Sequence, residues 1–177
     1  MRSLWTEERV TAHGQYYPLD EVSLEPRPVQ DSIPIWVSSN WVQRGLRRVA
    51  ELGDGWITNV TNTDLFSRCW DRIAQHASNA GRDPDSIKRC LYISVNLNSE
   101  EDALEEGDAF MRAYYGRPYE AVSKQLLCVF GPPEKCADAI SRYPEAGATY
   151  FIVRFASPNQ MAQMATFTTK VLPLVAS

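Results

Sequence analysis

Apolar and polar positions follow two alternating patterns along the chain from residue 33 onward. Four short apolar runs have the length of buried strands. Each is followed by a segment in which apolar residues recur every three or four positions, which is typical of one face of a helix. The strand-like runs are residues 33–37, 56–58, 90–97 and 149–155. Because strand and helix alternate four times, the pattern predicts an α/β fold with a parallel sheet.

The helix-like segments have recognisable beginnings and ends. Asn62 or Thr63 is placed to cap one helix, and Gly81 and Pro84 follow its end. Residues 99–102 have the spacing of a capping box. The predicted helices begin near residue 41, at residues 62–63, at residue 99 (ending about residue 115), at residue 119 (ending at 129), at residues 132–133 and at residue 160 (ending at 172).

Four strand–helix units leave two architectures open. A closed (β/α)8 barrel has eight strands in roughly 250 residues, whereas this chain has 177 residues. A parallel sheet needs cover on both faces. The chain therefore forms either a small open sheet with helices on both sides or half of a barrel with helices on one side.

Residues 1–32 differ from the rest of the chain. Residues 9–12 and 15–19 flank His13-Gly14, which predicts a small hairpin. Three prolines at positions 18, 26 and 28 then favour an extended backbone. We expect residues 1–32 to form a hairpin and extended insertion segment, and residues 33–177 to form the four-unit α/β part of one structural domain.

The composition narrows the class of partner. The formal net charge of −4 argues against nucleic acid or an acidic membrane surface. No apolar run approaches the roughly 20 residues that cross a bilayer, and no signal-peptide core follows Met1. The four cysteines (Cys69, Cys90, Cys128, Cys136) lack the spacing of a zinc site and are expected to be buried thiols. These features predict a cytoplasmic protein without a metal, membrane or nucleic-acid partner.

Several stretches of the sequence resemble the luciferase-like monooxygenase family. They are LWTEERVTAHGQYYPLDEVSLEPRPVQDSIPIWVSSN, RRVAELGDGWITN, GRDP and GPPEKCADAISRYPEAGATYFIVRF, in that order along the chain. The resemblance implies flavin- or deazaflavin-dependent oxidoreductases built as (β/α)8 barrels, and it covers only their C-terminal half. The four predicted strands match barrel strands five to eight, and residues 1–31 match the insertion before strand five.

The resemblance also implies a cofactor site after the first predicted strand. In the family, small residues at this point, usually glycines, receive the phosphate of the flavin cofactor. The matching residues are Ser38, Ser39 and Asn40. Their position suits an anion, because the start of the following helix offers free N–H groups and the positive end of a dipole. Serine and asparagine are also common helix caps, so a purely structural role stays open.

Four further residues are candidates for the same face. By the resemblance, Trp56 lies on strand six beside the cofactor, although a place in the core is the alternative. Thr58 and Asn59 stand at the carboxyl end of that strand, where loop polarity alone would also explain them. Arg154 lies inside the last apolar strand. It either reaches the barrel mouth as a ligand for substrate or phosphate, or faces a helix and pairs with a carboxylate.

No catalytic residue is predicted in this chain. His13 and His76 have no serine or cysteine partner placed for a triad. The stretch VFGPPEK lacks the spacing of a phosphate-binding loop and is read as a helix start. The acidic residues between positions 100 and 106 are expected to form a solvated helix face.

The resemblance implies an oxidoreductase of the luciferase-like class that uses FMN or a deazaflavin coenzyme for hydride or oxygen chemistry. The family's first four strands have no counterpart in the sequence, so this function needs a separate chain that supplies them or a second copy. Raw strand edges and an apolar inner face predict a homodimer or larger, with residues 33–37 and 151–155 near the interface. The alternatives are a non-catalytic half-barrel without cofactor, acting as an oligomeric or binding module, and an unrelated small open α/β domain.

Overall fold

The structure, a computed structural model, describes residues 1–175. The chain consists of two compact units, Met1–Ile35 and Trp36–Ser177. This division lies close to the predicted boundary between residues 32 and 33. Among the described residues, no helix combines the length and apolar character required to cross a bilayer.

The first unit contains the predicted hairpin. A short helix, α1 (Arg2–Thr6), precedes two antiparallel strands, β1 (Val10–Ala12) and β2 (Leu19–Val22). The second strand begins at Leu19, so residues 13–18 form the connection and residues 15–18 are not part of the strand as predicted.

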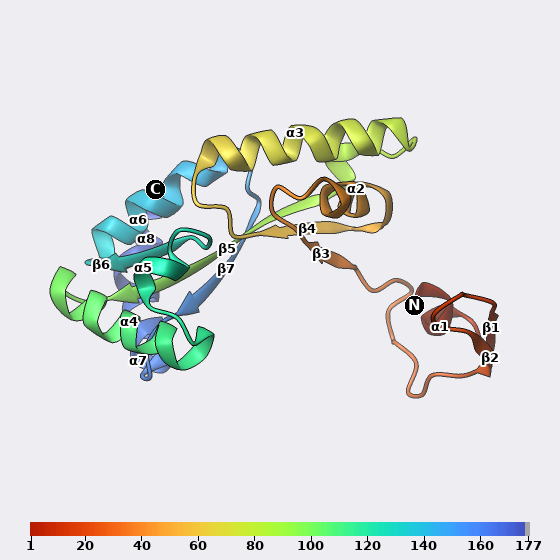
Figure 1. The fold of residues 1–177 in the computed structure, drawn as a ribbon, viewed down its shortest axis with the longest axis horizontal. Coiled ribbons are helices and arrows are strands. Elements are labelled where there is room, and N and C mark those ends of the chain that lie inside the picture. The colour runs from red at the N-terminus through yellow and green to blue at the C-terminus, as the bar shows by residue number, and fades with distance from the viewer. Residues whose placement is uncertain (176–177) are drawn as a thin grey trace. The chain divides into compact units, whose positions relative to one another are not determined.

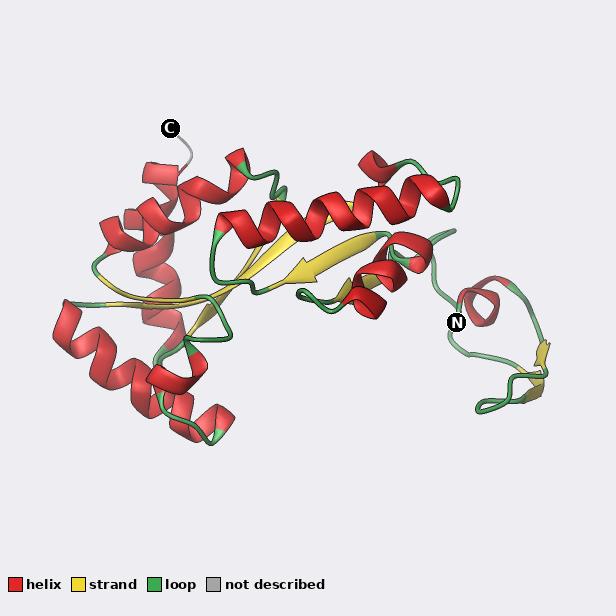
Figure 2. Cartoon of the chain, turned by 45° about the horizontal axis from the view of Figure 1, so that its top comes forward, coloured by secondary structure: helices red, strands yellow, loops and turns green. Residues whose placement is uncertain are grey.

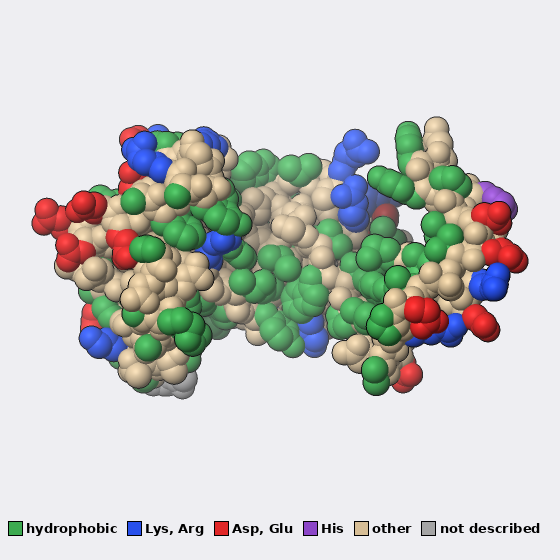
Figure 3. Space-filling model, turned by 90° about the horizontal axis from the view of Figure 1, so that it is seen from below, with side chains coloured by type: hydrophobic (Ala, Val, Ile, Leu, Met, Phe, Trp, Pro, Cys, Tyr) green, Lys and Arg blue, Asp and Glu red, His purple; other side chains and the backbone are tan. Residues whose placement is uncertain are grey.

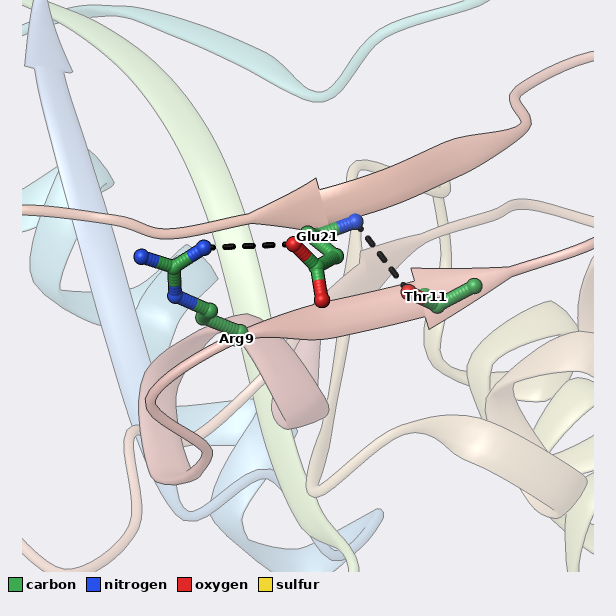
Figure 4. A network of polar contacts seen from close by, with 3 residues as sticks. All are labelled: Arg9, Thr11 and Glu21. Carbon is green, nitrogen blue, oxygen red and sulfur yellow. Dashed lines mark hydrogen bonds and ion pairs between the residues drawn. The ribbon is translucent and has the colours of Figure 1, made fainter.

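Side chains also link the two strands of the hairpin (Figure 4). The backbone N–H of Glu21 donates to Thr11 Oγ1 at 3.1 Å, and Arg9 Nη1 lies 3.3 Å from Glu21 Oε2. Both members of this ion pair are exposed over more than half of their side-chain surface. The pair therefore contributes little to stability, as exposed pairs generally do.

The second unit contains a parallel sheet of five strands (Figure 1). The order is β3-β4-β5-β6, and β7 pairs with β5. All pairs in this sheet are parallel. The four predicted strands are confirmed, with the first displaced toward the C-terminus. The strands are β3 (Trp36–Ser38), β4 (Gly55–Thr58), β5 (Lys88–Leu97), β6 (Cys128–Gly131) and β7 (Tyr150–Phe155).

Strand β6 corrects the prediction of a helix over residues 119–129. The helix that begins at Tyr119, α5, ends at Val122. Residues beyond it lie beside the second half of β5, which extends past the end of β4. The N–H of Leu127 donates to the carbonyl of Asn59 at 2.9 Å, and the N–H of Ser94 donates to the carbonyl of Leu127 at 3.0 Å. Strand β6 forms because it pairs backbone groups of β5 that β4 leaves open.

The helices follow the predicted caps. Asn62 Oδ1 accepts from the N–H of Leu65 at 2.8 Å, and Ser99 Oγ accepts from the N–H of Asp102 at 3.2 Å. The helix predicted near residue 41 begins at Gln43. The helical elements of this unit are α2 (Gln43–Leu52), α3 (Thr63–Asn79), the 3-10 turn Pro84–Ser86, α4 (Glu100–Tyr115), α5 (Tyr119–Val122), α6 (Pro133–Glu145), α7 (Gln160–Thr166), the π-helical turn Phe167–Val171 and α8 (Leu172–Val175).

One face of the sheet is covered by helices and is called the helix face here. Helices α2 and α3 pack side by side over β3, β4 and the start of β5, as Figure 2 shows. Helix α6 and the C-terminal helices pack against the rest of β5 and β7. The buried strand residues on this face include Trp56, Leu91, Ile93, Val95 and Leu97.

The GRDP stretch fastens α2 to the end of α3. The guanidinium of Arg82 donates to the carbonyl of Ala50 at 2.6 Å and to the carbonyl of Gly53 at 2.8 Å. These carbonyls lie at the C-terminus of α2. Carbonyls at this end of a helix have no N–H partners within the helix, and they carry the negative end of its dipole. Arg82 therefore holds the α2–β4 turn in place.

The opposite face, the open face, is covered only at the carboxyl end of β5. There Asn96 Nδ2 donates to Glu106 Oε2 of α4 at 2.8 Å. The ring of Phe130 packs so closely on Gly107 that a Cβ at Gly107 would lie 2.3 Å from it. Glu106 also accepts from Ser157 Oγ at 2.8 Å. It is therefore half-buried and bonded, and not part of the solvated acidic face that was predicted.

The helices of the second unit leave the remainder of the open face bare. Tyr150 and Ile152 of β7 are 48% and 40% exposed. The edge of the Trp36 ring packs against Tyr150, with centroids 5.3 Å apart. Figure 3 looks at this side of the molecule and shows hydrophobic side chains gathered on it. An apolar sheet face without a second layer is incomplete as a core.

The four strands β3, β4, β5 and β7 thus form a parallel series with α2, α3, α6 and the C-terminal helices on one side. This is the arrangement expected of the C-terminal half of a (β/α)8 barrel. Helix α4, helix α5 and strand β6 are an addition between the third and fourth units, and they bring a helix onto the open face.

Candidate functional site

The candidate site lies where β3 and β4 end, on the open face beneath the last turn of α4. It is a pocket of about 290 Å³, called the strand-end pocket below. The carboxyl ends of parallel strands are where α/β proteins bind their ligands. The residues that line it are Ser38, Ile57, Thr58, Asn59, Tyr92, Tyr114, Tyr115 and Arg154.

Asn40 ties the ends of β3 and β4 together. Its Oδ1 accepts from Thr58 Oγ1 at 2.8 Å, and its Nδ2 donates to Asn59 Oδ1 at 2.8 Å. The N–H of Asn59 also donates to Asn40 Oδ1 at 3.4 Å. The side-chain amide of Asn40 is thus engaged on both sides, which makes it a residue that holds the loop after β3.

Ser38 and Ser39 occupy different places in this loop. Ser38 is exposed and lines the strand-end pocket. The N–H of Ser39 donates to the carbonyl of Ile57 at 3.1 Å, and its side chain lies against Gly45 of α2. A Cβ at Gly45 would lie 2.1 Å from Ser39 Oγ. The glycine in α2 therefore allows the loop to approach the helix closely.

The start of α2 is not capped by the residues that could have capped it. Its N-cap is Val42, which makes no side-chain cap hydrogen bond. The structural alternative for Ser38, Ser39 and Asn40 as helix caps is therefore contradicted. Of the N–H groups in the first turn, that of Gly45 donates to the carbonyl of Val42 at 2.9 Å. The N–H groups that need acceptors from outside the helix are therefore those of Gln43 and Arg44. This arrangement fits an anionic group such as a phosphate.

Trp56 lies in the core and not in the pocket. Its side chain is 0% exposed and packs against Phe66 of α3, with ring centroids 4.8 Å apart. The alternation of β4 turns Trp56 toward the helix face, whereas its neighbour Ile57 lines the pocket. The indole Nε1 donates to the carbonyl of Ser39 at 2.7 Å. Trp56 can therefore support the loop after β3 but offers its ring no contact with a ligand.

Arg154 points into the strand-end pocket. Its Nη1 donates to the hydroxyl of Tyr92 at 2.9 Å, and its guanidinium lies 3.7 Å above the ring centroid of Tyr114. A more distant contact of 5.6 Å joins it to the ring of Phe110. Of the two predicted environments, the structure gives the pocket: within residues 1–175, no carboxylate forms an ion pair with Arg154.

The pKa values of two residues in the pocket are shifted upward. Burial lowers the pKa of Arg154 and the hydrogen bonds with Tyr92 and Tyr114 raise it, with a net upward shift. Burial raises the pKa of Tyr115 above its usual range. At neutral pH the pocket therefore presents the cation of Arg154 and the protonated hydroxyl of Tyr115, which suits a negatively charged ligand.

Three tyrosines were missed as site residues in the sequence. Tyr92 had a signal, because alternation along β5 places Tyr92, Ser94 and Asn96 on the face opposite to Ile93 and Val95. Tyr114 and Tyr115 come from the end of α4, whose position depends on tertiary packing and not on a local pattern.

Five of the seven predicted residues fall into two groups, while Ser39 packs on α2 and Trp56 lies in the core. Asn40, Thr58 and Asn59 meet at the strand ends through hydrogen bonds, with Ser38 beside them. Arg154 lies on the other wall of the same pocket. Among the described residues, no group of histidine, cysteine or acidic side chains is arranged to hold a metal ion.

Known proteins resemble the chain over most of its length. The family model for luciferase-like monooxygenases matches residues 1–150. An F420-dependent glucose-6-phosphate dehydrogenase of Kineococcus radiotolerans is 26% identical over 198 aligned positions, which cover 99% of this chain and 58% of the relative. A phthiodiolone/phenolphthiodiolone dimycocerosates ketoreductase of Mycobacterium tuberculosis is 33% identical over 68% of this chain and 33% of its own length.

Solved structures agree with the fold. An F420-dependent secondary alcohol dehydrogenase, in complex with an F420-acetone adduct, superposes with a TM-score of 0.76 at 20% identity, over 98% of this chain and 58% of that one. The long-chain alkane monooxygenase LadA gives 0.68 at 19% identity, over 96% of this chain and 46% of that one. The chain thus spans about half the length of these proteins, as expected for the C-terminal half of their barrel.

The family model covers most of the chain, and the parallel strands and the helices stand in the order that the resemblance implied. The chain belongs to the luciferase-like monooxygenase family.

Proposed function

We propose that this chain forms the C-terminal half of a flavin- or deazaflavin-dependent oxidoreductase and binds the cofactor at the strand-end pocket. The single observation that carries the proposal is the loop after β3. There the exposed Ser38 lines the pocket, the loop leads on to the first turn of α2, which has no side-chain cap, and Asn40, Thr58 and Asn59 fix the loop. Relatives named for F420 support a cofactor of this class.

Each residue of the site has a proposed role. Ser38, Ser39 and the first N–H groups of α2 bind the phosphate of FMN or of the deazaflavin coenzyme. Asn40 and Asn59 position this loop, and Trp56 supports it from the core. When bound, the cofactor supplies the hydride or oxygen chemistry. This chain contributes binding and orientation, and we assign it no catalytic acid or base.

The open face must be completed for activity. A pocket of about 290 Å³ is at the small end of the range that holds a whole ligand, roughly 300–1,000 Å³. Strands β3, β6 and β7 each pair with one neighbour in the sheet described here, and the open face between β3 and β7 is bare. We propose that a (β/α)4 half from a longer chain, from a separate chain or from a second copy closes the barrel. The second copy would give a homodimer or a larger assembly.

The test of the phosphate site compares FMN with riboflavin, which lacks the phosphate. FMN is expected to bind at least tenfold more tightly than riboflavin, measured by quenching of flavin fluorescence. Asn40→Asp keeps the acceptor for Thr58 and adds a negative charge beside the phosphate. It loses the donor to Asn59, whose own amide can turn and donate to the new carboxylate. It should weaken FMN binding about tenfold, the scale of one charge-assisted hydrogen bond, and leave riboflavin binding unchanged.

Asn79→Asp is the matched control, since it makes the same change on the exposed end of α3. It should leave the binding of both flavins unchanged. Titration of coenzyme F420 in parallel shows which cofactor is preferred. The proposal fails if neither FMN nor F420 binds at millimolar concentration, or if FMN and riboflavin bind equally to every variant.

A further inference from the structure

Arg154 is an unusual cation for this chain. Other arginines among the described residues have carboxylate partners, for example Arg112 with Asp108 at 2.6 Å and Arg47 with Glu51 at 2.6 Å. Arg154 has instead a tyrosine hydroxyl and aromatic faces, and its Nε is buried without a hydrogen-bond partner. Leaving a partly buried cation without an anion costs free energy. That cost is offset when a ligand supplies the anion.

Arg89 is a second arginine with similar contacts, but its surroundings differ from those of Arg154. It also lies over an aromatic ring, that of Trp70 at 4.4 Å, and its Nε is likewise buried without a partner. However, Arg89 lies on the helix face, packed close to Gly147, and it does not line the strand-end pocket. Arg154 alone of the two points its guanidinium at a space that a ligand can enter.

The guanidinium of Arg154 is held in a fixed orientation that suits an oxyanion. The hydrogen bond to Tyr92 and the stacking on Tyr114 fix the plane of the group from two sides. A fixed guanidinium plane favours two parallel hydrogen bonds to a carboxylate or phosphate and lowers the entropy lost on binding. Tyr92, Tyr114 and Tyr115 form the nearby wall, and such aromatic surface suits a flat or apolar body attached to the anion.

We propose that Arg154 binds the carboxylate or phosphate of the substrate, in a subsite walled by Tyr92, Tyr114 and Tyr115. The inference rests on the proposed function, in which the cofactor phosphate occupies the loop after β3. Strands β4 and β5 separate the backbones of β3 and β7 by about 14 Å at ordinary strand spacing, a distance that long side chains such as Trp36 and Tyr150 bridge on the open face. Ser38 and Arg154 line the strand-end pocket from these two strands. The cation therefore stands on the wall opposite the cofactor phosphate and is left for a second anion.

The experiment uses phenyl phosphate and inorganic phosphate as probes, with binding to the full chain measured by calorimetry at low salt. Phenyl phosphate should bind more tightly than inorganic phosphate, because its ring meets the tyrosine wall. Arg154→Gln should weaken both by about tenfold or more. Arg154→Lys should recover part of the loss, and Tyr92→Phe, which frees the guanidinium, should lose roughly threefold.

Arg89→Gln is the control, because it removes an equivalent arginine from the other face of the sheet. It should leave the binding of both probes unchanged. Circular dichroism checks that each variant is folded, and Tyr92→Phe provides a second test if Arg154→Gln is not. Equal binding of the probes by Arg154→Gln and the unchanged chain overturns the inference, and so does an equal loss in Arg89→Gln.

The FMN and riboflavin titrations separate this inference from the proposed function. Arg154→Gln should reduce phenyl phosphate binding while it leaves the preference for FMN over riboflavin intact. If that preference is lost instead, Arg154 serves the cofactor phosphate and the inference is wrong. If no cofactor binds but phenyl phosphate binds through Arg154, the proposed function fails and the anion site stands.

Discussion

Single buried side chains on α6 contribute to the response of the fold to alkali. Burial raises the pKa of the Cys136 thiol to about 12 and that of the Tyr143 hydroxyl to about 12. An unfolded cysteine loses its proton near pH 8.5. Above that pH the unfolded state binds fewer protons than the folded state, so the free energy of unfolding falls as pH rises.

This difference gives a prediction for Cys136→Ala. Between pH 9 and 10.5 the free energy of unfolding of the unchanged chain should fall by about 1.4 kcal/mol per pH unit more than that of the variant. Urea unfolding across the pH range measures the two slopes. Ser141→Ala, an exposed change on the same helix, should keep the original slope. Parallel slopes for Cys136→Ala and the unchanged chain would contradict the buried thiol.

The sequence predicted the cluster of Asn40, Thr58 and Asn59 at the strand ends better than it predicted the wall of the pocket that carries Arg154. Asn40, Thr58 and Asn59 follow adjacent parallel strands, and the ends of such strands meet, so their proximity was predictable. The orientation of Trp56 was left undecided because a four-residue strand buried on both sides shows no alternation. The stacking of Arg154 on Tyr114 had no sequence signal, since it joins residues 40 positions apart on a strand and a helix.

At the scale of elements, the contact between α4 and β6 depends on Gly107. A Cβ there would lie 2.3 Å from the Phe130 ring. Gly107→Ala should therefore destabilise the fold by about 1–3 kcal/mol, although alanine is the better helix former by about 1 kcal/mol. Urea unfolding measures the change.

Two companion variants identify the cause. Gly107→Ala combined with Phe130→Leu should recover part of the loss, because the smaller side chain makes room for the methyl group. Ala113→Gly, an exposed change in the same helix, should cost about 1 kcal/mol. This variant measures the effect of exchanging alanine and glycine at an exposed position of α4. A stabilised Gly107→Ala variant would mean that α4 does not pack on β6.

The elements that the sequence predicted well are those with local signals. The caps at Asn62 and Ser99 mark the starts of α3 and α4. A long run of mostly apolar residues marks β5. Strand β6 was mistaken for helix because Cys128–Gly131 is short and apolar, and such runs fit either structure. Its conformation is decided by the unpaired edge of β5, which lies more than 30 positions earlier in the chain.

For the whole molecule, the bare open face predicts association. Ile152 of β7 lies on this face and is 40% exposed, and a carboxylate placed there would have to be buried when the face is covered. If the chain associates through this face, Ile152→Asp should shift sedimentation profiles toward the monomer. Leu104→Asp, at a residue of α4 that is 47% exposed, should leave the profile unchanged. A monomeric unchanged chain at micromolar concentration would contradict self-association.

The pairing of β5 with β7 has a consequence for how the protein is made. Residues 90–95 of β5 pair with residues 150–155 of β7. During translation, β5 therefore leaves the ribosome about 60 codons before the strand that pairs with it. Until then its amide edge is open to chaperones or to nascent copies on the same messenger, and slow synthesis in the stretch between them prolongs that exposure.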